Sequence, residues 1–208
     1  MCASSVYPLE QNRLVLETER LRLRPLSLED HGLMAALQTD PQVMQYIGGP
    51  VPVEAISEKL ETSVRRGAGG RIGVWCIEGR RSGEKLGTAI LLPLPVEAYE
   101  ADPSQFVADA YPSAEIEVGY ILLRSAWGRG IATEACRRLL KFGFEETSLG
   151  QIAAVTHSDN LVSQKVLQKC GLRPEGMRRA YCNDVPGFRI TRAQWQALEK
   201  QRLIKAAD

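Results

Sequence analysis

The sequence predicts one α+β domain in which helices flank a mixed, largely antiparallel sheet of about seven strands. The chain has 208 residues, 44% of them hydrophobic and 25% charged, an ordinary composition for a single globular domain with a sizeable core. Runs rich in β-branched and aromatic residues are interspersed with stretches whose apolar residues recur every three or four positions. Helices and strands in such an order pack as layers around one core. No internal repeat is evident.

The N-terminal part of the chain predicts one strand and three helical segments. Leu21 and Leu23 alternate with arginines, which indicates a strand with one polar face. Ser27 followed by acidic residues indicates a helix start, because serine caps the first amides and acids favour the positive end of the helix dipole. The elements expected here are a surface arm at 1–17, a strand at 21–25, a helix from Ser27 to about Gln38, a helical turn from Asp40 and a helix at 53–66.

The rest of the chain predicts six strands and three helices. Gly171 is placed to end one helix, and Thr191 with Gln194 forms a capping box that starts the last one. The dipeptide Pro186-Gly187 indicates the turn of a final strand pair. The expected strands are 72–78, 85–92, 116–122, 152–157, 178–185 and 188–191, and the expected helices are 132–143, 161–170 and one that follows Thr191.

A long segment between the third and fourth expected strands, residues 93–114, is acidic and rich in proline. It contains four prolines and four carboxylates but neither lysine nor arginine. Loops of this length inside a compact domain are usually functional lids or disordered insertions. A solvated acidic loop without a further role is the alternative.

Residues 127–134 read Trp-Gly-Arg-Gly-Ile-Ala-Thr-Glu and lie between an expected strand and an expected amphipathic helix. Gly128 and Gly130 can adopt positive φ and leave the backbone open, so several amide groups can converge on one point. The unpaired amides and the dipole of the following helix reinforce that point, which predicts a cradle for an anion such as pyrophosphate. An ordinary tight turn is the alternative. The chain lacks the P-loop pattern, and Thr133 interrupts the dinucleotide-binding pattern, so the anion is expected to belong to another ligand.

Bulk composition excludes several classes of function. A net charge of +1 gives no electrostatic reason to expect nucleic acid as a partner. Five scattered cysteines and two histidines predict reduced thiols and no metal site. The N-terminus shows no signal-peptide pattern, and the longest apolar stretch is too short to cross a bilayer, so we expect a soluble cytoplasmic protein without membrane contact.

Several motifs in a fixed order resemble the GNAT superfamily of acetyl-CoA-dependent N-acetyltransferases. The resemblance is carried by the strand, cradle and helix at 116–144, by Asn160-Leu-Val-Ser163 and by Cys170-Gly-Leu172. Leu16-Glu-Thr-Glu-Arg-Leu-Arg-Leu-Arg24, Tyr46-Ile-Gly48 and the fixed positions of 127–135 also resemble the branch that holds ribosomal-protein N-terminal acetyltransferases. The resemblance spans about residues 14–198.

The resemblance implies a GNAT-type sheet that splays between its fourth and fifth strands, with acetyl-CoA in the gap. It implies that the backbone of Leu122 faces the pantetheine and the acetyl carbonyl, and that Asn160 hydrogen-bonds the cofactor arm. It also implies that pyrophosphate is held by the amides of Gly128, Arg129, Gly130, Ile131, Ala132 and Thr133. The implied reaction is acetyl transfer to the primary amine of a peptide N-terminus, an amino acid or a small molecule. Because Cys136 and Cys170 fall on expected core faces, where thiols are usually inert, we expect direct transfer within a ternary complex. The implied assembly is a monomer or a homodimer.

Two residues are candidates for the chemistry. Glu117 shares a strand face with Glu115 and matches an acid that many family members carry, so it is the candidate base; a solvent-facing glutamate is the alternative. Ser163 lies three residues after Asn160 on the same helix face and fits a serine that donates to the sulfur or to a cofactor oxygen. A helix-start serine bonded to nearby backbone is its alternative. At the position of Leu167, many family members have a tyrosine that protonates the departing thiolate. This chain lacks that acid.

Three interpretations therefore stand at the level of sequence: an active N-acetyltransferase, a catalytically inactive domain that binds acyl-CoA as a sensor or scaffold, and an unrelated module that binds another phosphate ligand. For the active enzyme we hypothesise that the acidic insertion closes over the acceptor and attracts a cationic amine.

Overall fold

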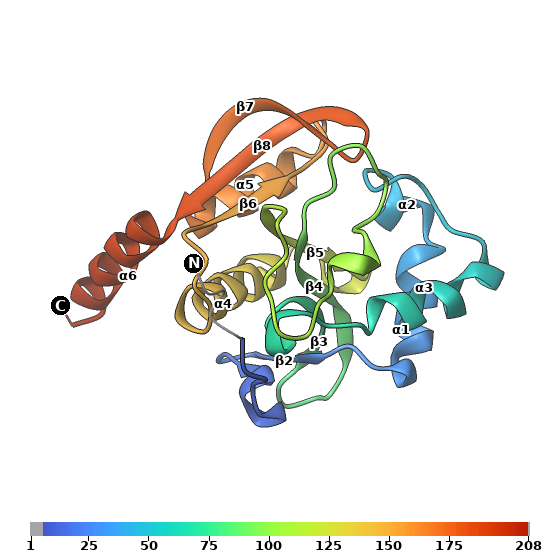
Figure 1. Ribbon diagram of the computed structural model, residues 1–208, viewed down its shortest axis with the longest axis horizontal. Coiled ribbons are helices and arrows are strands. Elements are labelled where there is room, and N and C mark those ends of the chain that lie inside the picture. The colour runs from blue at the N-terminus through green and yellow to red at the C-terminus, as the bar shows by residue number, and fades with distance from the viewer. Residues whose placement is uncertain (1–5, 208) are drawn as a thin grey trace.

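One eight-stranded sheet forms the centre of the computed structural model, which describes residues 6–207 (Figure 1). The strands are paired in the order β1-β2-β3-β4-β5-β6-β8-β7, and every neighbouring pair is antiparallel except β5 with β6. The strands are β1 (Leu16–Glu17), β2 (Leu21–Pro25), β3 (Gly73–Gly79), β4 (Lys85–Pro93), β5 (Ile116–Leu122), β6 (Gln151–Val155), β7 (Arg173–Ala180) and β8 (Asn183–Thr191). The predicted α+β class and mixed sheet are confirmed; the strand beyond the expected seven is the two-residue β1.

Residues 6–207 contain six α-helices, of which α1–α3 cover one face of this sheet and α4 and α5 the other, while α6 projects from the end of β8 (Figure 1). They are α1 (His31–Gln38), α2 (Pro41–Met44), α3 (Ile56–Ser63), α4 (Ile131–Glu145), α5 (Leu161–Cys170) and α6 (Arg192–Ala207). Short 3-10 turns are η1 (Gln11–Leu14), η2 (Leu28–Asp30), η3 (Val53–Ala55), η4 (Ala68–Gly70), η5 (Pro103–Gln105) and η6 (Arg124–Ala126). None of the helices between residues 6 and 207 has both the length and the apolar character needed to cross a membrane.

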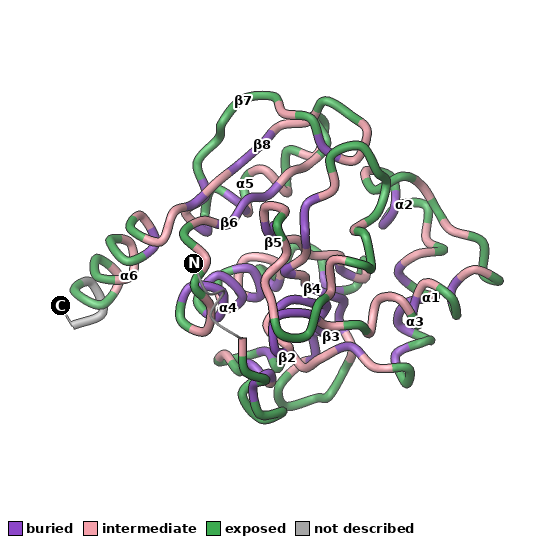
Figure 2. Tube along the Cα trace, in the orientation of Figure 1, coloured by how far each residue is buried: buried purple, intermediate pink, exposed green. Residues whose placement is uncertain are grey.

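The core is divided between the two faces (Figure 2). Val118 and Leu122 of β5 pack with α4 and α5 in the larger cluster, which also buries Trp75 and Phe142. Ile121, which points to the opposite face, packs with residues of α1, α2 and α3 in a second cluster. The period of two along β5 therefore assigns its alternate side chains to different helical layers.

Residues 6–17 contribute to the core and to the sheet, although the sequence predicts a surface arm for 1–17. Leu14 and Leu16 are buried in the larger core cluster, and β1 pairs with β2. The indole nitrogen of Trp75 donates to the Leu14 carbonyl at 2.9 Å. The prediction of an arm that only packs on the surface is therefore wrong for this segment, because two leucines are too few to produce the periodicity from which burial is inferred.

The final hairpin turns five residues earlier than predicted. Its turn is Tyr181-Cys182, and Pro186-Gly187 lies inside β8. Pro186 is accommodated because the pairing of β6 with β8 ends at Gly187, so its missing N–H breaks no bond in that ladder. Tyr and Cys are not typical turn residues, and the sequence therefore contained no signal at the true turn.

The acidic segment between β4 and β5, which includes residues 94–114, lies across the end of these strands (Figure 1), and its Phe106 and Tyr111 pack against the larger core cluster. Backbone bonds attach it at one end to Ala68, whose nitrogen donates to the Val107 carbonyl at 2.8 Å. Two of its carboxylates are already paired, Glu97 with Arg179 and Glu100 with Lys59. These partners reduce the charge with which the segment can attract a cationic amine.

Candidate functional site

The sheet opens between the two parallel strands, β5 and β6. Their register contains a single residue pair, Glu117 with Ala153. Bonds between Leu123 and Leu86 and between Leu94 and Glu115 show that the odd-numbered residues of β5 exchange hydrogen bonds with β4. The backbone groups of the even-numbered residues therefore face β6. Beyond the one pair, the edge formed by Tyr120 and Leu122 has no strand partner within residues 6–207, which is the splay expected from the family resemblance.

Leu122 lies at the wide end of this gap. The indole nitrogen of Trp127 donates to the Leu122 carbonyl at 2.9 Å, so the first residue of the glycine loop is tied to the end of β5. Gly87 of β4 stands opposite Leu122, and a Cβ there would lie 2.2 Å from the Ile121 carbonyl oxygen. Glycine is required at this position because the two backbones approach each other so closely.

The glycine loop has the geometry of an anion cradle. Gly128 and Gly130 adopt φ values of 70° and 77°, in the left-handed region that the sequence analysis anticipated. Gly130 is the N-cap of α4, so the amides of Ile131, Ala132 and Thr133 fall in the first turn, where N–H groups have no partner inside the helix. Ile131 is buried and anchors the turn to the core.

Arg20, which lies more than a hundred residues earlier in the sequence, forms hydrogen bonds that stabilise the glycine loop. Its guanidinium donates to the Arg129 carbonyl at 2.9 Å and to Glu134 at 2.7 Å. The hydroxyl of Thr18 also donates to Glu134, at 2.6 Å. The two motifs that carry the family resemblance near residues 20 and 130 are therefore in contact, which the sequence analysis did not foresee. A groove of about 770 Å³ lies beside Gly130 and Thr133, and its lining residues include six arginines or lysines and three glutamates.

The start of α5 lies next to β5. Asn160 is the N-cap, and its side-chain oxygen accepts from the Ser163 amide at 3.0 Å, which leaves its NH₂ group without a partner in the described part of the chain. The hydroxyl of Ser163 is 3.1 Å from the phenol oxygen of Tyr120. Burial raises the pKa of Tyr120, so the phenol stays protonated. Tyr120 was not predicted, whereas Leu167 is buried in the core as an apolar residue.

Glu117 is buried on the α1–α3 face, with a relative exposure of 4%. Its carboxylate accepts a hydrogen bond from the Tyr181 hydroxyl. Burial raises the pKa of Glu117 to about 7, even though Tyr181 and the charge of Arg178 act in the opposite direction. The alternative of a solvent-facing glutamate is therefore wrong, and the carboxyl group has the proton affinity of a base that works near neutrality.

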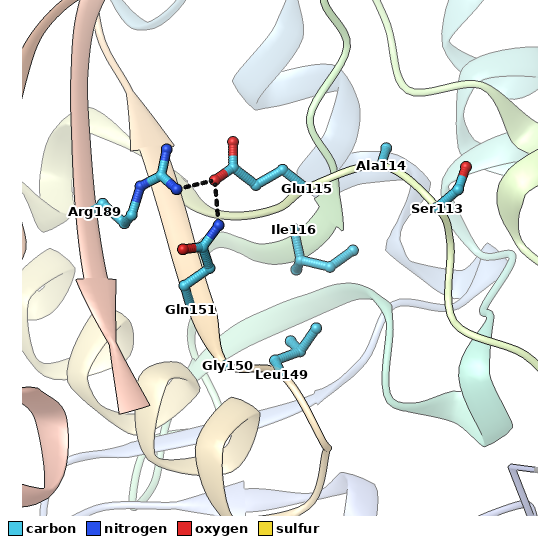
Figure 3. A pocket seen from close by; sticks show the side chains of 8 residues that line it. All are labelled: Ser113, Ala114, Glu115, Ile116, Leu149, Gly150, Gln151 and Arg189. Atoms are coloured by element: carbon cyan, nitrogen blue, oxygen red, sulfur yellow. Dashed lines mark hydrogen bonds and ion pairs between the residues drawn. The ribbon is translucent and has the colours of Figure 1, made fainter. Parts of the chain in front are cut away.

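Glu115, two residues earlier on the same face, has a different environment. It forms ion pairs with Arg178 at 2.6 Å and Arg189 at 3.1 Å, and it accepts from Gln151 at 3.1 Å. Glu115, Gln151 and Arg189 border a cavity of about 470 Å³ at the N-terminal ends of β5 and β6, the end remote from the glycine loop (Figure 3). The carboxylate of Glu115 is thus used in a structural network.

Other reactive groups do not gather into a site. Cys76, Cys136 and Cys170 are buried. Within the described range, no three His, Cys, Asp or Glu side chains lie together in a way that could hold a metal ion.

Comparison with known proteins assigns this arrangement to a family. Residues 20–173 match the family model described as "Acetyltransferase (GNAT) domain". The Bacillus subtilis protein YkkB is 33% identical over 158 residues, which cover 76% of this chain and 84% of that protein. An Aspergillus fumigatus protein named FsC-acetyl coenzyme A-N(2)-transacetylase is 28% identical over 200 residues, 92% of this chain and 82% of the relative. The aminoglycoside acetyltransferase AAC(6')-Ib, solved with coenzyme A, superposes with a TM-score of 0.67 at 16% identity, over 85% and 98% of the two chains.

Proposed function

Because the chain belongs to the acetyltransferase (GNAT) family of acetyl-CoA-dependent enzymes, we propose that it moves an acetyl group from acetyl-CoA to a primary amine by direct transfer in a ternary complex. The observation that carries this proposal is the gap between β5 and β6, which are paired at one position only. An open strand edge offers amides and carbonyls to the pantetheine arm in the way that a neighbouring strand would.

The residues present fit the cosubstrate at three points. The amides of residues 128–133 belong to the left-handed loop and to the first turn of α4, and they can hold the pyrophosphate. Leu122 offers its N–H on the edge that faces the gap, which suits a carbonyl of the pantetheine arm. The NH₂ group of Asn160 can donate to the cofactor arm while its oxygen caps α5.

The transfer needs a neutral amine, a polarised carbonyl and a proton for the departing sulfur. Glu117, directly or through a water molecule, takes the proton of the incoming ammonium group. The amine nitrogen then attacks the thioester carbon, the C–N bond forms, and the C–S bond breaks. The nitrogen loses its second proton as the amide forms, and the hydroxyls of Ser163 and Tyr120, 3.1 Å apart, can relay a proton to the departing sulfur in exchange. The three buried thiols are poorly placed to carry the acetyl group, which favours transfer without a covalent intermediate.

For the acceptor we propose a peptide N-terminus, an amino acid or a small amine. The motif at 16–24, Tyr46-Ile-Gly48 and the form of the cradle at 127–135 support the branch that holds ribosomal-protein N-terminal acetyltransferases. The FsC transacetylase shows by its name that a relative acetylates a nitrogen atom of another compound.

Thiol release from acetyl-CoA, measured across a panel of amines and short peptides, tests the proposal. An active enzyme releases thiol only when a suitable amine is present. If coenzyme A binds but no amine supports release, the inactive acyl-CoA-binding alternative gains support. If NAD or ATP protects the fold from heat as well as coenzyme A does, the module binds a different phosphate ligand.

Substituting Gly128 with alanine is expected to weaken coenzyme A binding about tenfold, roughly 1.4 kcal/mol. A side chain at φ 70° is disfavoured, and relaxation of the backbone would turn amides away from the pyrophosphate. Isothermal titration calorimetry measures the dissociation constant.

Gly83→Ala is the matched control for this substitution. Gly83 adopts φ 68° in the β3–β4 hairpin, and at both glycines an added Cβ meets nothing within 4 Å. Both variants should therefore lose similar stability. Equal affinities of the two variants for coenzyme A would show that the loop does not hold the pyrophosphate.

A further inference from the structure

The turn between β7 and β8 has an unfavourable backbone conformation. Its two residues, Tyr181 and Cys182, adopt φ values of 51° and 58°. Two consecutive left-handed residues form a type I′ turn, which normally uses asparagine and glycine. Side chains in this conformation persist where surrounding contacts enforce them, and such positions are concentrated at functional sites.

The acidic segment after β4 supplies the contacts that hold this turn. The amides of Tyr181 and Cys182 donate to the carbonyls of Pro95 and Val96 at 3.0 and 2.9 Å. Next to the turn, the Arg179 guanidinium binds both carboxylate oxygens of Glu97 at 2.9 and 3.0 Å. The conformation of the turn is therefore imposed by a segment that lies more than eighty residues earlier in the sequence.

This conformation places the Tyr181 hydroxyl on the carboxylate of Glu117. Both side chains are mostly screened from water, and Glu117 is almost completely buried. In the part of the chain that the structure describes, Tyr181 is the hydrogen-bond donor to this carboxylate. The strained turn, its support and the bond to Glu117 form a continuous connection from the acidic segment to the candidate base.

The charged groups around Glu117 come from three elements. Arg178 of β7 acts on it through its charge, and Glu115, directly before β5, lies on the same face, where Arg189 of β8 pairs with it. The neighbouring strands contribute no charge, because the residues paired with Glu117 are Leu92 of β4 and Ala153 of β6.

We propose that Tyr181 is a positioning residue: it orients the Glu117 carboxylate toward the acceptor and favours its ionised form, and the segment after β4 keeps it in place. This proposal rests on the proposed function for the role of Glu117 as the base. It also gives the insertion a role other than electrostatic attraction of the acceptor.

The hydrogen bond from Tyr181 stabilises the charged form of the buried Glu117 carboxylate. A buried carboxylate without a donor holds its proton to a higher pH, because burial disfavours the charged form. The phenol of Tyr181 remains protonated, since burial and the neighbouring carboxylate raise its pKa. It therefore donates throughout the working range of the base.

The variant Tyr181→Phe removes the donor and retains the ring. We expect the titration midpoint of the Glu117 carboxyl to rise by about one pH unit, a tenfold change in its ionisation constant. Carbon-13 NMR of labelled glutamate carboxyls follows this titration without turnover, and comparison with Glu117→Gln assigns the signal. The acid limb of the kcat profile should move by a similar amount, with activity recovering at higher pH. Tyr99→Phe is the control, because Tyr99 is an exposed tyrosine of the acidic segment after β4.

The outcomes separate this proposal from the proposed function. An unchanged Glu117 titration in folded Tyr181→Phe overturns the role of Tyr181, whatever the activity. A raised midpoint without acetyl transfer by any form of the protein supports the role of Tyr181 and overturns the proposed function. A loss of kcat at all pH values with no shift of the midpoint shows that Tyr181 acts only through the structure of the turn, which also overturns the proposal.

Discussion

Replacing Glu117 with glutamine is expected to lower kcat for acetyl transfer by roughly 10²- to 10³-fold, the usual range for removal of a positioned base. Glutamine keeps the size and the polar contact to Tyr181 but cannot accept the proton of the ammonium group. The affinity for coenzyme A should change little, because the cradle lies at the other end of β5. Steady-state thiol release together with calorimetry of coenzyme A measures both quantities.

The pH dependence follows from the raised pKa of Glu117. With a value of about 7, the carboxyl is mostly protonated at pH 6, so kcat of the native enzyme should rise with pH through neutrality. The glutamine variant should lack this limb. Glu115→Gln, on the same strand face, is the control and should keep the limb. A variant at Glu117 that retains both full kcat and the limb would remove this residue from the mechanism.

Stability should change in the opposite direction to activity. A carboxyl whose pKa is raised by folding contributes stability below its unfolded value of about 4.5, and that contribution is lost as the pH rises through about 7. Glutamine carries no charge to bury. We therefore expect Glu117→Gln to be at least as stable as the native protein at pH 8, as urea unfolding would show.

Replacing Asp30 with alanine is expected to destabilise the fold by about 3 kcal/mol, at the lower end of the range for breaking a buried ion pair. Asp30 is fully buried and binds Arg24 at 2.7 and 2.8 Å and Lys85 at 2.6 Å. The variant leaves both cations without this partner, although each keeps some contact with water and Arg24 still pairs with Glu78. Urea unfolding at pH 7 measures the loss.

The same site should make stability sensitive to acid. Burial alone would raise the pKa of Asp30, but hydrogen bonds from Arg24 and Lys85 outweigh it and hold the pKa well below its ordinary 3.8. The ion pair therefore contributes fully above about pH 4 and is lost as the pH falls below that value. The difference between the native protein and Asp30→Ala should shrink in that range. Glu145→Ala, which removes an exposed pair with Lys141, should cost less than about 1 kcal/mol and serves as the control.

Helix ends that carry a capping residue were predicted correctly from the sequence. Gly171 ends α5 at φ 98°, Asp40 caps α2, and the amides of Thr191 and Gln194 bond to each other's side chains as a capping box requires. The last hairpin was misplaced because its turn is made by residues without turn propensity and is stabilised by the distant Pro95 and Val96. The burial of Leu9, Leu14 and Leu16 was missed for a related reason, since three leucines in an irregular segment show no period.

The candidate site divides in the same way. The glycine loop, Asn160, Ser163 and Glu117 could be proposed from the sequence because each belongs to a short motif. Tyr120, Tyr181 and Arg20 were missed because their partners are 43, 64 and 114 residues away in the sequence. Such partners become visible only when the topology brings β5, α4, α5 and the last hairpin together.

The position of Trp127 gives the protein an intrinsic optical probe. Of its three tryptophans, Trp75 and Trp195 are buried, whereas Trp127 is 44% exposed beside the open end of β5. A molecule that enters there should change the polarity around this one indole, and therefore the intensity or wavelength of its emission. Titration of coenzyme A should produce a saturable fluorescence signal that is absent in Trp127→Phe. Occupancy could then be followed in stopped-flow mixing without any label.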